Sequence, residues 1–220
     1  MFAAAQAARR TALRLGLLVL LSGFVLAAMA SEDDPHAHHR EMMKKSQPGP
    51  SARATVEVPD TTLLTQDGDA LKLSSEVMGD RIVVVDFIYT TCTTVCPVLS
   101  AILSQVQREV GDRLGKDVVL VSITVDPLRD SPARLKDYSA RLQARDGWYW
   151  LTGSKTDIDD VLRAMGAYTP SFKDHPSMIL VGDSSNDTWS RYVGFPGANQ
   201  ILKKIDELST ARNAQAAVTE

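Results

Sequence analysis

Residues 82–97 read IVVVDFIYTTCTTVCP, and this stretch decides the fold. The first eight residues are apolar and mostly β-branched or aromatic, apart from Asp86, which predicts a strand buried on both faces. Cys92 and Cys96 follow in the next turn and are the two cysteines of the chain. Pro97 suits the first turn of a helix, where its missing N–H would have no partner anyway. The stretch therefore predicts two thiols at a strand-to-helix turn.

Apolar periodicity continues on both sides of this stretch and predicts one globular domain over residues 54–209. Crossover helices between apolar strands imply parallel pairing, and a final hairpin adds antiparallel edges. We therefore expect an α/β, thioredoxin-like fold: a central mixed sheet with flanking helices and an N-terminal β-hairpin extension. The expected elements are a hairpin over 56–73, strands at 82–89, 118–125, 148–151, 178–181 and 189–193, and helices from 97 to Gly111 or Gly115, from Ser131 to 143, from a cap at Thr156 or Asp157, and over 198–208.

The two ends of the chain are expected to lie outside the domain. Residues 1–30 combine three arginines, an uncharged apolar run of 16 residues and a small-x-small cleavage pattern at 28–30, which is typical of a signal peptide. The run is shorter than the 18 or more residues typical of a spanning helix. We expect export to a bacterial periplasm, with residues 1–30 cleaved or retained as an inner-membrane anchor. Residues 210–220 are expected to form a disordered tail.

Residues 31–53 are polar and punctuated by proline and glycine, so they predict a flexible tether. This tether carries five side chains that bind soft metals: His36, His38, His39, Met42 and Met43. The formal net charge of the chain is −3 and no basic cluster stands out, which argues against a nucleic-acid partner.

Cys92 and Cys96 are spaced i and i+4, so a helical turn would put both thiols on one face. A helix N-terminus favours the thiolate, which is the form that binds metal and the form that attacks disulfides. A purely structural disulfide is the weaker interpretation, since closing so short a loop stabilises a protein by only about 2 kcal/mol. Metal binding and redox exchange both remain open at this point.

A third ligand would favour metal, and His175 is the one histidine inside the predicted domain. Thioredoxin-like folds place a cis-proline before the last hairpin, against the cysteine turn. If Pro176 holds that position, His175 lies within reach of the thiols. Two thiolates and an imidazole form a soft set that selects Cu(I) and can also hold Cu(II) or zinc. Structural zinc prefers four ligands, so copper fits better.

Three segments resemble signatures of the SCO/SenC proteins: residues 86–97, 121–132 and 150–153. The resemblance covers about residues 56–208. It implies a thioredoxin fold and a role in cytochrome c oxidase assembly, in which family members deliver copper to the binuclear site or keep the cysteines of that site reduced. The metal ligands of the family correspond to Cys92, Cys96 and His175.

The leading hypothesis is therefore a copper-binding assembly factor, or metallochaperone, that serves the copper-accepting subunit of cytochrome c oxidase. Other copper chaperones are further candidate partners, and the histidine- and methionine-containing tether is a candidate for transient copper capture. The alternative is an enzyme, a thiol-disulfide oxidoreductase in which Cys92 and Cys96 reduce the cysteines of the oxidase. A peroxidase-like enzyme of the same fold is a third reading, which peroxide turnover would test.

Three acidic residues near the cysteine turn are expected to have structural roles. Asp126 and Asp130 precede a predicted helix and are expected to act as caps. Asp86 could tune the thiols from within its strand, but a hydrogen-bonded or edge-facing acid is the simpler expectation.

Overall fold

The computed structural model describes residues 52–219 of the 220-residue chain. The predicted signal peptide or anchor lies outside the described residues, as do the tether up to residue 51 and its histidines and methionines. Ala52 and Arg53, which we expected at the end of the tether, instead belong to the first strand of the sheet.

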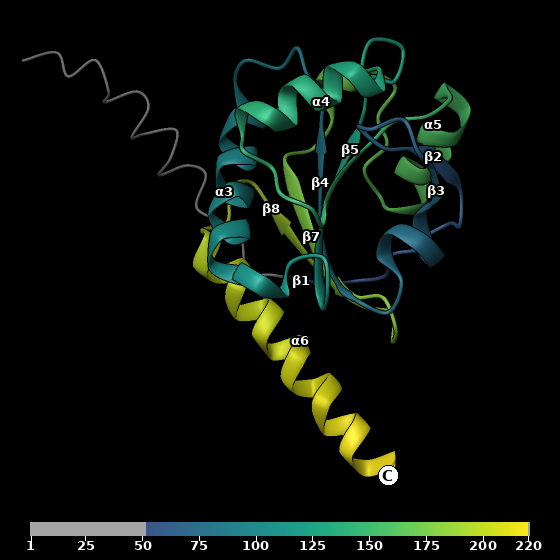
Figure 1. The fold of residues 1–220 in the computed structure, drawn as a ribbon. Coiled ribbons are helices and arrows are strands. Elements are labelled where there is room, and N and C mark those ends of the chain that lie inside the picture. The colour runs from purple at the N-terminus through teal and green to yellow at the C-terminus, as the bar shows by residue number, and fades with distance from the viewer. Residues whose placement is uncertain (1–51, 220) are drawn as a thin grey trace, which may run out of the picture. The chain divides into compact units, whose positions relative to one another are not determined.

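A six-stranded mixed sheet forms the centre, in the order β1-β8-β7-β4-β5-β6 (Figure 1). The pairs β4–β5 and β5–β6 are parallel, and the other three pairs are antiparallel. This topology confirms the predicted central mixed sheet. The strands are β1 (Ala52–Ala54), β4 (Ile82–Ile88), β5 (Val118–Thr124), β6 (Trp148–Leu151), β7 (Met178–Asp183) and β8 (Thr188–Val193).

Strand β4 is buried along its whole length, as the apolar run predicted. Successive side chains of a strand point to opposite faces, so β4 feeds two separate cores. Val83, Val85 and Phe87 belong to one apolar cluster. Ile82, Val84 and Ile88 belong to the other cluster, which also contains both cysteines.

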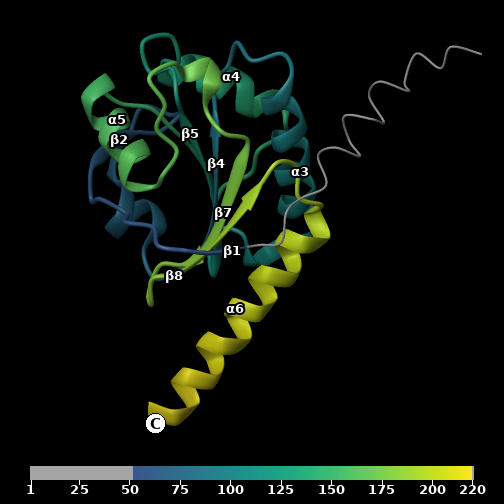
Figure 2. The same ribbon diagram turned by 180° about the vertical axis from the view of Figure 1, so that it is seen from behind.

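Helices α3 (Val95–Val110), α4 (Pro132–Arg141) and α6 (Ala198–Thr219) supply the cluster that contains the cysteines. The opposite cluster draws on α5 (Lys155–Ala164) and the π-helix η1 (Leu73–Met78). It also takes in the predicted hairpin of β2 (Thr62–Leu64) and β3 (Ala70–Lys72). Figures 1 and 2 show α3 and α6 on one side of the sheet and α5 with the hairpin on the other.

Local signals explain most helix ends. Ser131 caps α4 as predicted, because its side chain accepts a hydrogen bond from the N–H of Arg134. Gly111 ends α3 with a φ of 61°, in the left-handed region that favours glycine. The expected cap of α5 was wrong: Ser154, not Thr156 or Asp157, accepts the capping hydrogen bond.

Helix α6 continues to Thr219, where we expected a disordered tail from residue 210. No glycine or proline follows Gly197 to stop it. Arg212 also ties this part of the helix to the sheet by ion-pairing with Asp183 of β7. In Figures 1 and 2 the last turns of α6 extend beyond the edge of the sheet.

Three aromatic rings stack inside the cluster that contains the cysteines. Trp148 and Trp150 of β6 have ring centroids 5.0 Å apart, and Tyr138 of α4 lies 5.4 Å from Trp150. The Tyr138 hydroxyl shares a 3.4 Å hydrogen bond with Ser100 of α3. Trp189 lies in the opposite cluster. The stack thus joins the outer parallel strand to the helix that begins at the cysteine turn.

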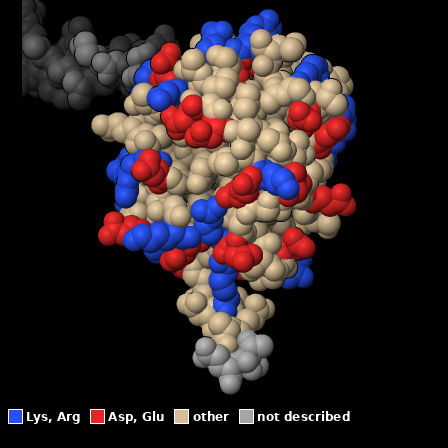
Figure 3. All heavy atoms as spheres, turned by 45° about the vertical axis from the view of Figure 1, so that its right-hand side comes forward, with Lys and Arg blue, Asp and Glu red and all other residues tan. Residues whose placement is uncertain are grey.

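The charged surface seen in Figure 3 mixes both signs, with acidic and basic side chains interspersed across that face. Between residues 52 and 219, no helix is both long enough and apolar enough to span a bilayer. The 3₁₀ turns η2 (Gly111–Arg113) and η3 (Phe172–Asp174) complete the described elements.

Candidate metal centre

The cysteine turn closes between the end of β4 and the start of α3. The N–H of Cys92 donates to the carbonyl of Tyr89 at 3.1 Å. The N–H of Cys96 donates to the Cys92 sulfur at 3.4 Å. The Cys92 sulfur therefore accepts one of the N–H groups in the first turn of α3 that have no partner within the helix. Both cysteines are buried free thiols. The predicted pair of neighbouring thiols at a strand-to-helix turn is therefore confirmed.

The environment of Cys92 favours its thiolate. Burial raises the pKa of this thiol, but hydrogen bonds from the backbone and thiol of Cys96, from the N–H of Thr94 and from the Tyr89 hydroxyl outweigh burial. Together they lower the pKa of Cys92 to about 7. Near neutral pH a large fraction of Cys92 is thus ready to bind a metal or attack a disulfide.

The environment of Cys96 has the opposite effect and favours the protonated thiol. Burial raises the pKa of its thiol well above the ordinary value, and the neighbouring Cys92 sulfur and the Asp86 carboxyl raise it further. Near neutral pH Cys96 in the free protein therefore stays a thiol, while Cys92 is partly thiolate. A soft cation that displaces the Cys96 proton would reverse this preference, because a coordinating thiol is deprotonated by the metal.

Asp86 lies fully buried in β4. One carboxylate oxygen, Oδ1, accepts a 2.5 Å hydrogen bond from the Ser122 hydroxyl, while Oδ2 is buried without a partner. Burial raises the pKa of Asp86 to about 7, even though the Ser122 hydrogen bond acts to lower it. Asp86 is thus a hydrogen-bonded acid, as the simpler expectation had it, but a half-satisfied one.

His175 follows η3, and its half-buried ring packs edge-on against Tyr89 with centroids 5.7 Å apart. Its Nδ1 atom is buried and has no hydrogen-bond partner. Burial lowers the pKa of His175, which favours the neutral imidazole that ligates metals. The expected cis-proline was wrong, because residues 52–219 contain no cis peptide bond.

Tyr89 links the two halves of the predicted ligand set. Its carbonyl accepts the N–H of Cys92, and its ring meets His175 edge-on. In the part of the chain that the structure describes, no three His, Cys, Asp or Glu side chains are arranged to hold a metal ion. The structure therefore brings the thiols together and places His175 one side chain away.

The donor chemistry nevertheless fits a soft metal. The two sulfurs and the unpaired Nδ1 are soft or borderline donors, and no carboxylate joins them. A buried polar atom without a partner is unusual in a native protein, and an unpaired imidazole nitrogen is available to ligate a metal. The set Cys92, Cys96 and His175 stays a prediction.

Asp130 has a role that the sequence did not reveal. Its carboxylate accepts hydrogen bonds from the N–H and hydroxyl of Thr90 and from the hydroxyl of Thr124. It therefore clamps the ends of β4 and β5 together just before the cysteine turn, and the expected helix cap was wrong. Asp126 instead pairs with Arg129 at 2.9 Å. The position of Asp126 and Asp130 in the loop that follows β5 was the available signal.

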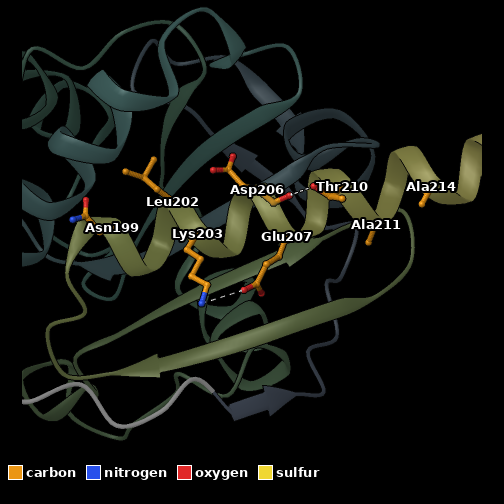
Figure 4. A pocket seen from close by; sticks show the side chains of 8 residues that line it. All are labelled: Asn199, Leu202, Lys203, Asp206, Glu207, Thr210, Ala211 and Ala214. Atoms are coloured by element: carbon orange, nitrogen blue, oxygen red, sulfur yellow. Dashed lines mark hydrogen bonds and ion pairs between the residues drawn. The ribbon is translucent and has the colours of Figure 1, made fainter.

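Two hollows differ in their relation to this centre. A cleft of about 120 Å³ is bounded by His175, Phe172 and the 125–129 loop. A larger, shallow hollow of about 810 Å³ runs along α6, where the side chains in Figure 4 include a Lys203–Glu207 ion pair and no sulfur or imidazole. The lining of this hollow offers nothing to a soft metal. The small cleft reaches His175 but is lined by neither cysteine.

The fold and the site together define a class: a thioredoxin-like domain with a reactive dithiol at the end of its central parallel strand. The family model SCO1/SenC matches residues 51–210. The chain belongs to the SCO1/SenC family, as its sequence signatures predicted.

Individual relatives support this assignment. The SCO1 protein homolog of Bacillus subtilis is 34% identical over 106 residues, which span 47% of this chain and 53% of the relative. The chain thus matches about half the length of that relative. A protein of Stutzerimonas stutzeri, described as a candidate copper-binding protein, is 26% identical over 154 residues, or 70% of each chain.

A solved structure of BsSco, a member of the Sco family of cytochrome c oxidase assembly proteins in which a disulfide switch was identified, superposes with a TM-score of 0.62. It is 26% identical, and the match covers 72% of this chain and 96% of BsSco. The predicted thioredoxin-like fold is confirmed by this likeness.

Proposed function

We propose that this protein is a copper-binding assembly factor that delivers copper to the binuclear copper site of cytochrome c oxidase. Cys92, Cys96 and His175 hold the copper. The partner is the copper-accepting subunit of the oxidase, and the protein works in the periplasm, either free or anchored through residues 15–30.

One observation carries the proposal: a neutral imidazole with an unpaired, buried Nδ1 lies one side chain away from a dithiol. A purely redox dithiol has no need of such an imidazole. Membership of the SCO1/SenC family and the likeness to the S. stutzeri protein support copper as the ion.

The two thiols have complementary tasks in copper capture. Cys92 offers a thiolate near neutral pH and can bind the incoming ion first. Cys96 is protonated in the free protein, so its binding releases a proton. The second step therefore makes the affinity for copper rise with pH.

The test is copper titration of the reduced full-length chain combined with X-ray absorption. The proposal expects a shell of two sulfurs and one nitrogen, and His175→Ala should lose the nitrogen and weaken Cu(II) binding by at least about tenfold, since metal-site partners are commonly worth 10–100-fold. Lys173→Ala, an exposed neighbour, is the matched control. An all-sulfur shell in the unmodified protein would contradict the ligand set.

A second candidate function is thiol-disulfide exchange, in which the protein reduces the cysteines of the oxidase copper site. The asymmetry between a reactive Cys92 and a proton-holding Cys96 favours it, because an attacking thiolate and a resolving thiol are what exchange requires. In that case the His175→Ala variant should reduce a disulfide-bonded dicysteine peptide as fast as the unmodified protein does. Cys92→Ser and Cys96→Ser should both abolish catalytic turnover.

A further inference from the structure

Tyr89 follows the end of β4 and connects the two halves of the candidate metal centre. Its carbonyl accepts the N–H of Cys92 at 3.1 Å, so its backbone is part of the cysteine turn. Its hydroxyl acts to lower the pKa of Cys92. Tyr89 is therefore tied to the thiol side of the centre.

The ring of Tyr89 is held equally firmly on the histidine side. It meets Phe172 edge-on at 5.1 Å and 77°, and His175 edge-on at 5.7 Å and 84°. Edge-to-face packing at these separations is favourable for aromatic pairs. Both partners come from the η3 segment and the residue that follows it, so one tyrosine ring organises that segment.

The row of stacked groups extends to a third loop. The Arg129 guanidinium lies 5.5 Å from the centre of the Phe172 ring. Arg129 also pairs with Asp126. In the same loop, Asp130 accepts a hydrogen bond from Thr90, the residue after Tyr89. We name this set of contacting side chains the aromatic row: Arg129, Phe172, Tyr89 and His175.

This arrangement leaves His175 incompletely satisfied. Its ring is packed against Tyr89, while its buried Nδ1 finds no partner. Tyr89 thus touches the imidazole with its ring and the cysteine turn with its backbone carbonyl. The described residues accordingly contain no complete three-ligand group.

We propose that Tyr89 is the positioning residue of the centre: its ring holds His175 away from the thiols in the metal-free protein and withdraws when the imidazole joins the bound copper. This inference rests on the proposed function. It divides copper capture into two events, binding by the sulfurs and then rearrangement of the aromatic row.

The first test is made on the unmodified sequence, and one variant serves only to assign resonances. Full-length reduced chain with isotope-labelled histidine and tyrosine is studied by NMR, with and without Cu(I), and His175→Gln assigns the His175 resonances. We expect ring-to-ring nuclear Overhauser contacts between Tyr89 and His175 in the metal-free chain. With Cu(I), the His175 nitrogen shift should report coordination and those contacts should be lost.

The second test follows Cu(II) binding by rapid mixing, monitored at the sulfur-to-copper absorption band. We expect a fast phase and a slower phase, with the slower phase missing in His175→Ala. Tyr89→Leu should merge the slower phase into the first, because the ring is gone. Tyr89→Phe, which keeps the ring and loses only the hydroxyl, is the matched control and should keep the slower phase.

The outcomes separate this inference from the proposed function. Persistent Tyr89–His175 contacts in a copper-loaded chain with a coordinated His175 nitrogen overturn the role of Tyr89 alone. So does a slower phase that is unchanged in Tyr89→Leu or equally accelerated in Tyr89→Phe. Absence of any copper-dependent change at His175 overturns the proposed ligand set and this inference together.

Discussion

Two aspartates are buried on the paired strands β4 and β7, and their surroundings are opposite. Asp183 accepts hydrogen bonds from Ser185, Asn186 and Arg212, and the Arg212 guanidinium contacts both of its oxygens. Asp86 accepts one side-chain hydrogen bond, from Ser122, and leaves its other oxygen without a partner.

The pKa values follow this difference. Burial acts to raise the pKa of Asp183, but hydrogen bonds from Arg212 and Ser185 outweigh it and the pKa falls below the ordinary value. For Asp86 burial prevails and the pKa rises to about 7. The Asp183 carboxylate, at the end of the sheet away from the cysteines, is thus fully paired, while Asp86 in the strand that leads to the cysteines has one buried oxygen without a partner. An unpaired buried atom costs stability and is retained where function needs it.

Among the substitutions that probe this contrast, Asp86→Asn should cause the largest change in the free energy of unfolding. Because the folded pKa lies above the ordinary 3.8, the stability that Asp86 contributes is full below pH 3.8 and is lost as pH rises through about 7. Three pKa units correspond to about 4 kcal/mol over that window. Urea unfolding between pH 4 and 8 should show this decline, and Asp86→Asn should remove it.

Asp183→Asn is the matched comparison for that experiment. The lowered pKa of Asp183 contributes stability above pH 3.8 that is lost as pH falls through the folded pKa, so this variant should flatten the acid limb instead. Identical pH profiles for the two variants would remove the distinction between the two aspartates.

Arg212→Ala should come second, with a loss of about 3 kcal/mol in the free energy of unfolding. The change leaves the fully buried Asp183 carboxylate without its cation, and breaking a buried pair typically costs 3–5 kcal/mol. Ser185 and Asn186 still donate to Asp183, which places the loss at the low end. Lys203→Ala, exposed on the same helix, should change stability little, and copper binding should be unaffected by either substitution.

Ser122→Ala should cost about 2 kcal/mol, since it leaves both the Asp86 carboxyl and the Trp148 indole N–H without partners. It should also raise the pKa of Asp86 further, because the Ser122 hydrogen bond lowers it. Ser104→Ala is a sharp control. That buried hydroxyl has no hydrogen-bond partner to lose, so a similar cost there would show that the Ser122 network is not the cause.

His175→Ala should have the smallest effect on stability, about 1 kcal/mol, which is the value of its edge-on contact with Tyr89. Its Nδ1 forms no hydrogen bond that could be lost. Thermal unfolding of the metal-free chain measures this effect, with Lys173→Ala as the control. A loss above about 3 kcal/mol, as expected of core truncations, would mean that His175 is a structural residue.

The fold could be predicted from the sequence because its signals are local. Strand β4 is a continuous apolar run, α3 starts at a turn marked by Pro97, and Ser131 caps α4 as read from the chain. The misplaced cap on α5 arose among several polar residues that can all accept the first N–H groups. The C-terminal part of α6 was missed because Arg212 meets Asp183 only in the folded chain.

The site was predictable to the extent that spacing determines geometry. Cys92 and Cys96 are four residues apart, and the helical turn brings them together. The location of His175 beside Tyr89 depends on η3 and on contacts across the fold, so only the argument from fold placed it near the turn. Asp130 reaches Thr90 over 40 residues of sequence, which no local pattern encodes.

The closely packed rings of Trp148, Trp150 and Tyr138 give this protein an intrinsic fluorescence probe. They share an apolar cluster with both cysteines, whereas Trp189, the remaining tryptophan, emits from the opposite cluster. Bound Cu(II) should quench the stacked pair more strongly than Trp189. The intrinsic fluorescence of the unlabelled protein should therefore fall when copper binds, with the emission of Trp189 least affected.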